Sequence, residues 1–425
     1  MHTGIGWVDF SSEHRDRVRS VIDLLAAPGV VDELGVGIVR DAFADTMFPG
    51  VSTIQTRPKY FLIVPRILKD YENLPDRKRK QQSALEYLAE QEMYCRITLG
   101  RRYEFRQGLG VIGVSFRERT DRDVLRQPSS VYWNGLSLFN IIRPDISMDD
   151  FDKRYSGHRP PSSLLLQETK NEHGDDFDAD DLNTSPIIHL PEVKEWKENL
   201  AITLSAEDAR FLRNQIGATQ AHTLLGQILL NSELLKQVAL LPSNAPFSDL
   251  LELPGIKTLN DRRMLRIIQL AADFWRLLSG AHLRYNILLQ TRYGNKEKEQ
   301  EYLEEWAAWM DELRSFDWEA FSMEEIWSLV EQRGRKPHAW TRKFIGRWID
   351  SIQQPATDNV LDEIVIQQES ANKRVRARLR IDSKDVSATD WIGFQDLAYR
   401  LPQVRQMALD IHRAETGEAD PDAGL

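Results

Sequence analysis

The chain has 425 residues, of which 41% are hydrophobic and 28% are charged, so it can build more than one globular domain. Its formal net charge of −10 argues against a protein that coats nucleic acid without selectivity. The single cysteine, Cys95, excludes an intrachain disulfide framework and a zinc site made of several thiolates.

Membrane and export signals are missing from the sequence. No run of about 18 apolar residues occurs, and the first residues lack a basic segment followed by an apolar core. The sequence therefore predicts a cytoplasmic protein with no membrane partner.

Helical spacing dominates the first part of the chain. Helices are predicted over about 13–25, 34–43 and 79–99, and a short one begins near Pro128. The glycine-rich stretch 100–113 between them favours a β-hairpin or wing. These elements predict a mainly α fold whose N-terminal domain, residues 1–156, is helical and winged-helix-like.

The segment "STIQTRPKYFLIVPRILKDYE", residues 52–72, combines a polar start with an apolar run. Thr56 is predicted to cap a helix that has Pro58 in its first turn. The apolar residues between 60 and 71 then recur at helical spacing, with a kink expected at Pro65. A strand over 61–64 is the alternative.

Acidic residues and turn formers without periodicity fill the middle of the chain. They predict a flexible acidic linker over residues 157–191. The C-terminal domain, residues 192–425, is predicted to be helical, with Ser205 as a helix cap and a long central helix over 261–294. Its many tryptophans are expected to pack between helices.

The sequence gives little support for a cofactor or metal. "GLGVIG" at 108–113 matches G-x-G-x-x-G, but charged sequence precedes it and polar sequence follows it, so a dinucleotide site is not expected. No P-loop and no H-E-x-x-H motif occurs. His282 is interpreted as a buried core residue. We therefore predict no cofactor, no metal and no catalytic residue.

One enzymatic alternative remains open. Asp145, Glu168 and Lys170 follow the order of a metal-dependent nuclease, in which two carboxylates hold Mg²⁺ and a lysine steadies the attacking water. Such spacing is common by chance, and Glu168 and Lys170 fall in the predicted linker.

Basic residues concentrate in two stretches despite the acidic total. In "KRVRARLR", a helix or an extended strand would each align several guanidinium groups, which suits phosphate oxygens. A solvated face is the alternative. The residues predicted to contact nucleic acid in these stretches are Arg374, Arg376, Arg378, Arg380, Lys78, Arg79 and Lys80.

The polar loop before the predicted helix at 60–71 is a third candidate. Gln55 and Arg57 there, with neighbouring hydroxyl groups, could hold a phosphate backbone near a helix N-terminus. The alternative is that these side chains only brace the loop.

Four segments occur in an order that resembles an uncharacterised bacterial family, a numbered domain of unknown function. They are "GIGWVDFS", "STIQTRPKYFLIVPRIL", "PSSVYWNGL" and "LLSGAHLRYNILL". The resemblance implies an association with phage-defence gene clusters, beside helicase and phospholipase-D-like genes. It supplies no catalytic residues, and His282 stands where the family has a small residue.

Together these observations predict a non-enzymatic subunit of a bacterial antiphage defence system. It would bind DNA or a helicase or nuclease protein of the same operon, which would supply the chemistry. The alternatives are a Mg²⁺-dependent nuclease and an adaptor that binds only proteins.

Overall fold

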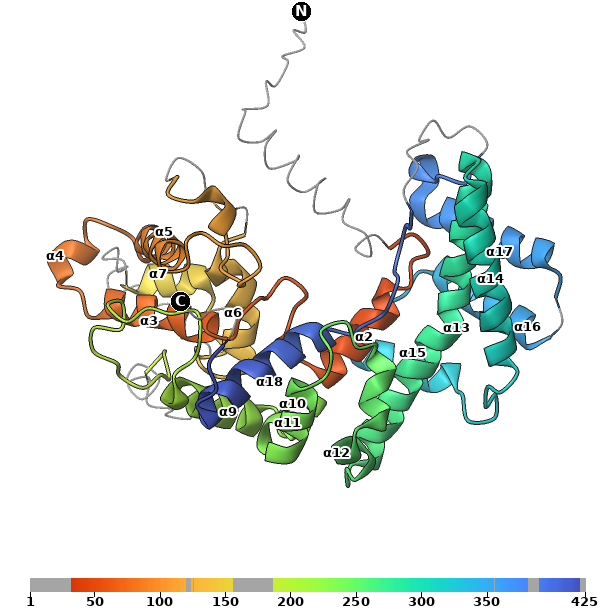
Figure 1. Cartoon of the computed structure of the whole chain (residues 1–425). Helices are drawn as coiled ribbons and strands as arrows, with labels where there is room; N and C mark the ends of the chain where they lie inside the picture. The colour runs from red at the N-terminus through yellow and green to blue at the C-terminus, as the bar shows by residue number, and fades with distance from the viewer. Residues whose placement is uncertain are drawn as a thin grey trace, which may run out of the picture. The chain divides into compact units, whose positions relative to one another are not determined.

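The computed structural model describes residues 32–119, 124, 126–155, 186–354, 356–380 and 390–420. Helices make up most of these residues (Figure 1). The only β-pairing among them is an isolated antiparallel bridge between Ile142 and Ile188. The predicted mainly α fold is therefore confirmed.

The described elements are α-helices and short 3₁₀ helices. They are α2 (Gly37–Met47), α3 (Tyr60–Glu72), α4 (Asp76–Arg79), α5 (Ala84–Arg102), η1 (Val114–Phe116), α6 (Pro128–Leu138), α7 (Met148–Tyr155), α9 (Ala206–Thr219), α10 (Leu224–Leu230), α11 (Ser232–Ala239), η3 (Phe247–Glu252), α12 (Pro254–Lys257), α13 (Arg262–Tyr293), α14 (Lys296–Leu313), α15 (Met323–Gln332), α16 (Ala339–Gln353), α17 (Asp358–Lys373), η4 (Arg374–Arg376) and α18 (Leu401–Thr416).

The chain forms two compact units, and each unit draws on separate stretches of sequence. The first contains the described residues up to Thr46, together with 246–252 and 259–399. The second contains 47–245, 253–258 and the described residues from Arg400. This grouping differs from the predicted division into 1–156, 157–191 and 192–425. Residues 156–185, which include most of the predicted linker, lie outside the described residues.

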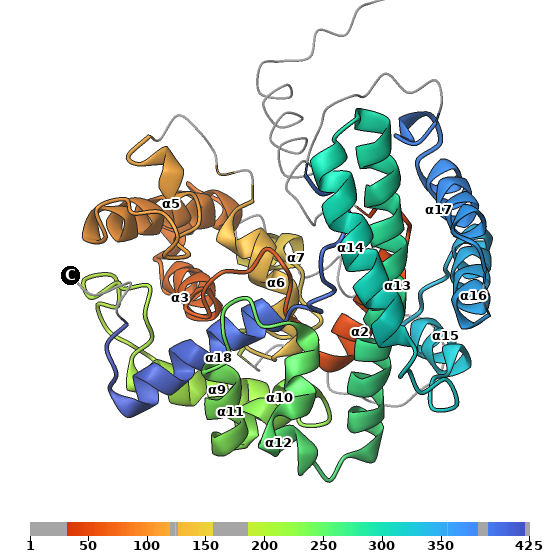
Figure 2. The same ribbon diagram turned by 45° about the vertical axis from the view of Figure 1, so that its right-hand side comes forward.

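The long helix α13 organises the first unit. Asp261 caps its start by accepting the backbone N–H of Met264, and Gly294 ends it in the left-handed conformation. Figures 1 and 2 show α14 running beside α13, and α16 and α17 packing as a pair that also contacts α13. The predicted long central helix over 261–294 is confirmed.

Tryptophans join these helices. The rings of Trp306 and Trp309 stack with centroids 4.9 Å apart, and both lie near the fully buried Trp348. The Trp348 indole N–H donates to the carbonyl of Leu277 on α13. These three tryptophans pack between helices, as the sequence predicted.

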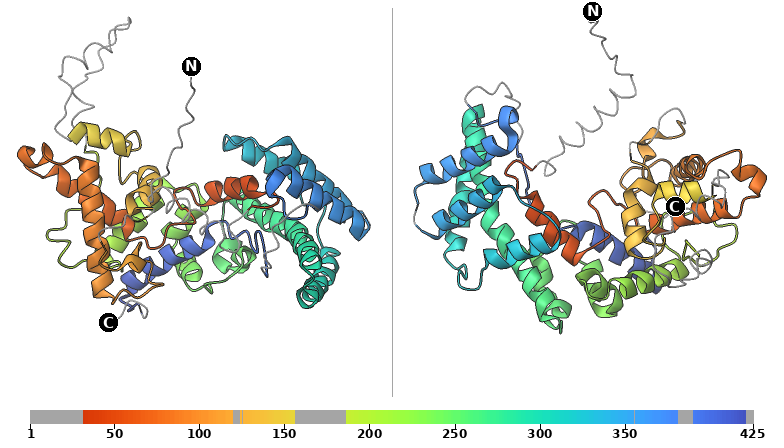
Figure 3. Two further views of the ribbon diagram at one scale, coloured as in Figure 1. Left: turned by 90° about the horizontal axis from the view of Figure 1, so that it is seen from above. Right: turned by 180° about the vertical axis from the view of Figure 1, so that it is seen from behind.

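The second unit combines two groups of helices. Helix α3 contacts α5 and α6, and α18 contacts α9, α10 and α11. Figure 3, in which α18 is blue and α9 to α11 are green, shows the second group side by side. Ser205 caps α9 by accepting the N–H of Asp208, as predicted.

Helix α3 confirms the helical interpretation of the opening segment and shows that the strand alternative over 61–64 is wrong. Every residue from Tyr60 to Leu68 is buried. The predicted cap is wrong, however. Lys59 occupies the N-cap position, while the Thr56 hydroxyl donates to the carbonyl of Gly110, 2.7 Å away.

The predicted hairpin or wing over 100–113 is absent from the structure. Helix α5 continues to Arg102, and turns follow it. Glu104, Phe105, Gly108, Gly110 and Gly113 all have positive φ, which extended strands cannot accommodate. The predicted helix over 13–25 lies outside the described residues.

Candidate nucleic-acid interface

The arginine-rich stretch of the first unit begins where α17 ends. Arg374 has φ of 54°, which breaks the helix and starts the single 3₁₀ turn η4. Ala377 then adopts an extended conformation and is buried. The arginines therefore lie on neither the continuous helix nor the continuous strand that the sequence suggested.

The carboxylate of Glu369 fixes the stretch that follows η4. It is fully buried and accepts the backbone N–H groups of Arg378 and Leu379, at 2.7 and 2.9 Å. The hydroxyl of Tyr285 on α13 donates to the same carboxylate at 2.8 Å. Because the Glu369 carboxylate that accepts these bonds is fully buried, the backbone leaving the turn has a defined path.

The tip of this turn is exposed. Arg374, Val375 and Arg376 are all exposed, and Val375 retains 88% of its accessible surface. Arg378 and Arg380 are only half-buried, and both have interaction partners. Two guanidinium groups and one apolar side chain are thus presented together, and we call residues 374–376 the arginine turn.

The base of the turn is also charged. Lys373 forms an ion pair with buried Glu33, with 3.2 Å between Nζ and Oε2. Burial raises the pKa of Glu33, and Lys373 partly opposes this effect. The pair connects the end of α17 to the segment that precedes α2.

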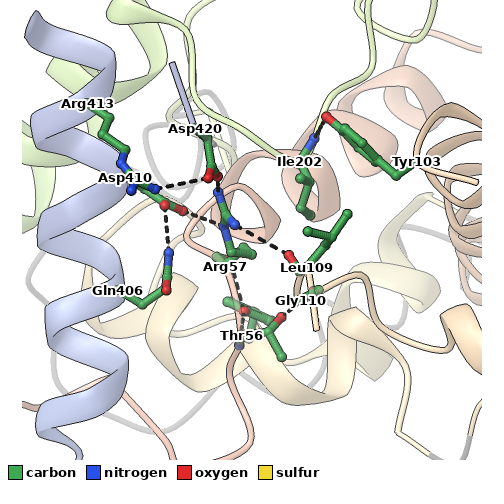
Figure 4. Close-up of polar contacts among 11 residues, drawn as sticks. Thr56, Arg57, Tyr103, Leu109, Gly110, Ile202, Gln406, Asp410, Arg413 and Asp420 are labelled. Carbon is green, nitrogen blue, oxygen red and sulfur yellow. Dashed lines mark hydrogen bonds and ion pairs between the residues drawn. The ribbon is translucent and has the colours of Figure 1, made fainter. Parts of the chain in front are cut away.

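Arg57 lies in the second unit and is buried, with 6% of its surface exposed. Figure 4 shows its guanidinium group between two carboxylates, where Nε donates to Asp410 at 2.7 Å and Nη2 to Asp420 at 2.6 Å. Nη1 reaches the carbonyl of Leu109 at 3.4 Å. Two carboxylates thus occupy the positions that a phosphate would need.

The ionisation of this network follows from its burial. Burial would lower the pKa of Arg57, but Asp410 and Asp420 outweigh that effect and raise it. Burial raises the pKa of Asp410 to about 6, although the charge of Arg57 opposes the rise. Gln406 and Arg413 of α18 complete the hydrogen bonds of the two carboxylates (Figure 4).

Gln55 is also turned inward. Its side-chain amide donates to the carbonyl of Gly50 at 3.0 Å and accepts the N–H of Ser52 at 3.2 Å. It is 7% exposed. These contacts favour the alternative that Gln55 and Arg57 brace the loop, while phosphate binding by them stays a prediction.

The predicted cluster of Lys78, Arg79 and Lys80 belongs to α4 and its C-cap. Both lysines are exposed, whereas Arg79 pairs with Asp76 of the same turn. The 13 residues of α3 separate this cluster from Gln55 and Arg57. The structure therefore does not bring the two groups together, and the arginine turn belongs to the other unit.

The residues of the nuclease alternative are described only in part. Asp145 is exposed and accepts two hydrogen bonds from Arg143, at 2.7 and 3.0 Å, which lower its pKa. Glu168 and Lys170 lie outside the described residues. Within the described ranges, no group of three histidine, cysteine or acidic side chains could hold a metal ion.

A second buried ionic cluster was not predicted. The Asp208 carboxylate accepts from Lys59 Nζ at 2.6 Å and from Arg66 Nη2 at 2.5 Å. Burial would raise the pKa of Asp208, but the two cations outweigh it and lower the pKa. The signal in the sequence was a cation inside an apolar helix, because Arg66 interrupts the stripe of α3.

The comparison with known protein families finds a match over nearly the whole chain, which confirms the predicted resemblance to a numbered family of unknown function. The model of the family of unknown function DUF6361 matches residues 2–401. The chain belongs to this family. No curated protein and no solved structure matches this DUF6361 chain.

In the parts of the chain that the structure describes, no helix combines the length and the apolarity needed to cross a membrane.

Proposed function

We propose that this DUF6361 protein is a non-enzymatic subunit of a bacterial antiphage defence system that binds DNA through the arginine turn. The observation that supports the proposal is the exposure of Arg374 and Arg376 on a turn whose exit is fixed by Glu369. A planar guanidinium group on a pre-arranged backbone loses less entropy for each hydrogen bond that it makes to phosphate. A helicase or nuclease protein of the same operon would supply the chemistry.

Val375 favours a second candidate, an adaptor that binds only protein. The apolar side chain of Val375 keeps 88% of its accessible surface. A partner that covers it would lower the free energy of the complex by removing this surface from water. The flanking arginines would then pair with an acidic surface of that partner. The two candidates use the same turn and differ in what covers it.

We expect the double variant Arg374→Gln/Arg376→Gln to bind duplex DNA more weakly than the unaltered protein. Each lost phosphate contact should lower the slope of log affinity against log salt concentration by about 0.9, so two contacts lower it by about 1.8. The measurement is a salt titration of affinity with several unrelated duplexes, because phosphate contacts carry no sequence preference.

The matched control is Arg262→Gln/Arg314→Gln, which removes two exposed positive charges from the same unit. We expect it to leave the salt slope unchanged. Equal losses in both double variants would show a general charge effect and contradict a defined interface. If the unaltered protein binds no DNA and the turn variant fails to retain a co-purifying operon protein, the adaptor is the better description.

A further inference from the structure

The first unit contains a cavity of about 460 Å³ that the proposed function does not use. Its walls come from η3, one face of α13, the C-terminal part of α14 and Asp396 in the loop before α18. Figure 2 shows α13 and α14 side by side. The volume falls within the range of about 300–1,000 Å³ that is usual for small-molecule sites.

The charges in the cavity do not balance. Three carboxylates line it, from Asp273, Glu312 and Asp396, against the single guanidinium group of Arg276. Arg276 is already committed to α14, because its Nε lies 3.0 Å from Glu312 Oε1 and its Nη2 donates to the Glu312 carbonyl at 2.9 Å. The cavity therefore has an excess of negative charge.

The two aspartates carry that excess. Asp273 accepts the side-chain amide of Gln269 at 3.0 Å, and Asp396 accepts the backbone N–H of Leu397. Among the described residues, neither has an ion-pair partner. Burial raises the pKa of both carboxyl groups, that of Asp396 to about 6. The charge of Asp249 adds to the rise at Asp396, whereas the charges of Arg276 and Arg266 partly oppose it at Asp273. A cation in the cavity would relieve this cost.

Aromatic rings also line the cavity, from Phe247, Trp275 and Trp309. The Trp309 indole N–H donates to the carbonyl of Arg276 at 2.8 Å, and its ring stacks on Trp306. It also lies against Gly280, where an added Cβ would stand 2.4 Å from the ring. Trp309 is thus fixed before any ligand arrives.

Carboxylates beside indole rings recognise a particular chemistry. An alkylammonium group gains from the negative charge and from the face of an aromatic ring, and its apolar body gains from burial. A bare divalent cation would instead need several oxygen ligands converging on one point. No such group of three acidic, histidine or cysteine side chains occurs in the described parts of the chain. We propose that this cavity binds a small organic ammonium compound.

The test uses spermidine as the probe and isothermal titration calorimetry of the full chain as the measurement. We expect saturable binding with one site per chain at an ionic strength near 0.15 M. Asp273→Asn and Asp396→Asn should each weaken it at least tenfold, since each removes one negative charge from the cavity wall and keeps the side-chain volume. Glu324→Gln removes an exposed carboxylate of the same unit and should leave the affinity unchanged.

Two further measurements test the aromatic wall and the selectivity of the cavity. Gly280→Ala should displace the Trp309 ring and weaken spermidine binding while leaving all carboxylates in place. Mg²⁺ at equal ionic strength should not compete. The proposal is overturned if spermidine does not bind, if the aspartate variants bind it as well as the unaltered protein, or if Mg²⁺ displaces it. Binding of a lysine-rich peptide without binding of spermidine would also overturn it, in favour of a protein partner.

Discussion

Replacing Arg57 by alanine is expected to lower the free energy of unfolding by about 3–5 kcal/mol, because it leaves the buried Asp410 carboxylate without a cation and removes one of the two cations paired with Asp420. Asp410 and Asp420 are both buried, and each is within 2.7 Å of an Arg57 nitrogen. Asp410 would keep only Gln406, and Asp420 would keep Arg413. The measurement is urea unfolding at pH 7.5, followed by circular dichroism.

Two companion variants separate geometry from charge. Arg57→Lys keeps the positive charge but has one nitrogen in place of the three that reach Asp410, Asp420 and Leu109, so its loss of stability should be intermediate. Arg101→Ala breaks the exposed pair with Glu118 and should cost less than about 1 kcal/mol. If Arg57→Ala costs no more than Arg101→Ala, then Arg57 does not brace the second unit, and the prediction of phosphate binding by Arg57 regains weight.

The helices were the part of this fold that the sequence could predict. Helix α13 follows from periodicity together with a capping aspartate and a terminal glycine, all of which act within one or two turns. The cap of α9 at Ser205 is equally local. Such signals do not depend on the rest of the chain, and the helices that they predict are therefore present in the structure.

Pairings between distant residues were beyond the same reasoning. Arg57 and Asp410 are 353 residues apart, and Lys59 and Asp208 are 149 apart. The sequence around Arg57 or Lys59 contains no pattern that identifies the distant partner. Arg57 was therefore interpreted as a group free to bind phosphate. The same limit applies to the two units, since a change in composition marks a candidate linker but does not show that the chain returns to an earlier unit.

The candidate site has one property that the sequence predicted and one that it did not. The concentration of arginines at 374–380 was visible in the sequence, but their arrangement was not. Glu369 of α17 accepts backbone N–H groups from Arg378 and Leu379, and this contact bends the chain away from either regular conformation. A buried carboxylate that stabilises a turn leaves no periodic signal, because it acts through the backbone of other residues.

His282 should make the protein sensitive to acid, and His282→Leu should remove that part of the sensitivity. The side chain is fully buried between Trp275 and Phe394, and neither ring nitrogen has a hydrogen-bond partner among the described residues. Burial lowers its pKa to about 3, from an ordinary value of 6.5. The unfolded chain therefore binds this proton more readily, and stability is lost as the pH falls below 6.5.

The size of this loss of stability follows from the difference between the folded and unfolded pKa of His282. When the pH falls from 7.5 to 5.0, the free energy of unfolding of the unaltered protein should fall by about 2 kcal/mol because of His282. The His282→Leu variant should not show this loss. Asp410 and Asp396, whose raised pKa values act in the opposite direction, are common to both proteins and cancel in the difference. Urea unfolding at the two pH values measures it. His222→Leu, at an exposed histidine, is the control and should follow the unaltered protein. Parallel pH dependences of the unaltered protein and His282→Leu would mean that His282 finds a proton acceptor or water in the folded state.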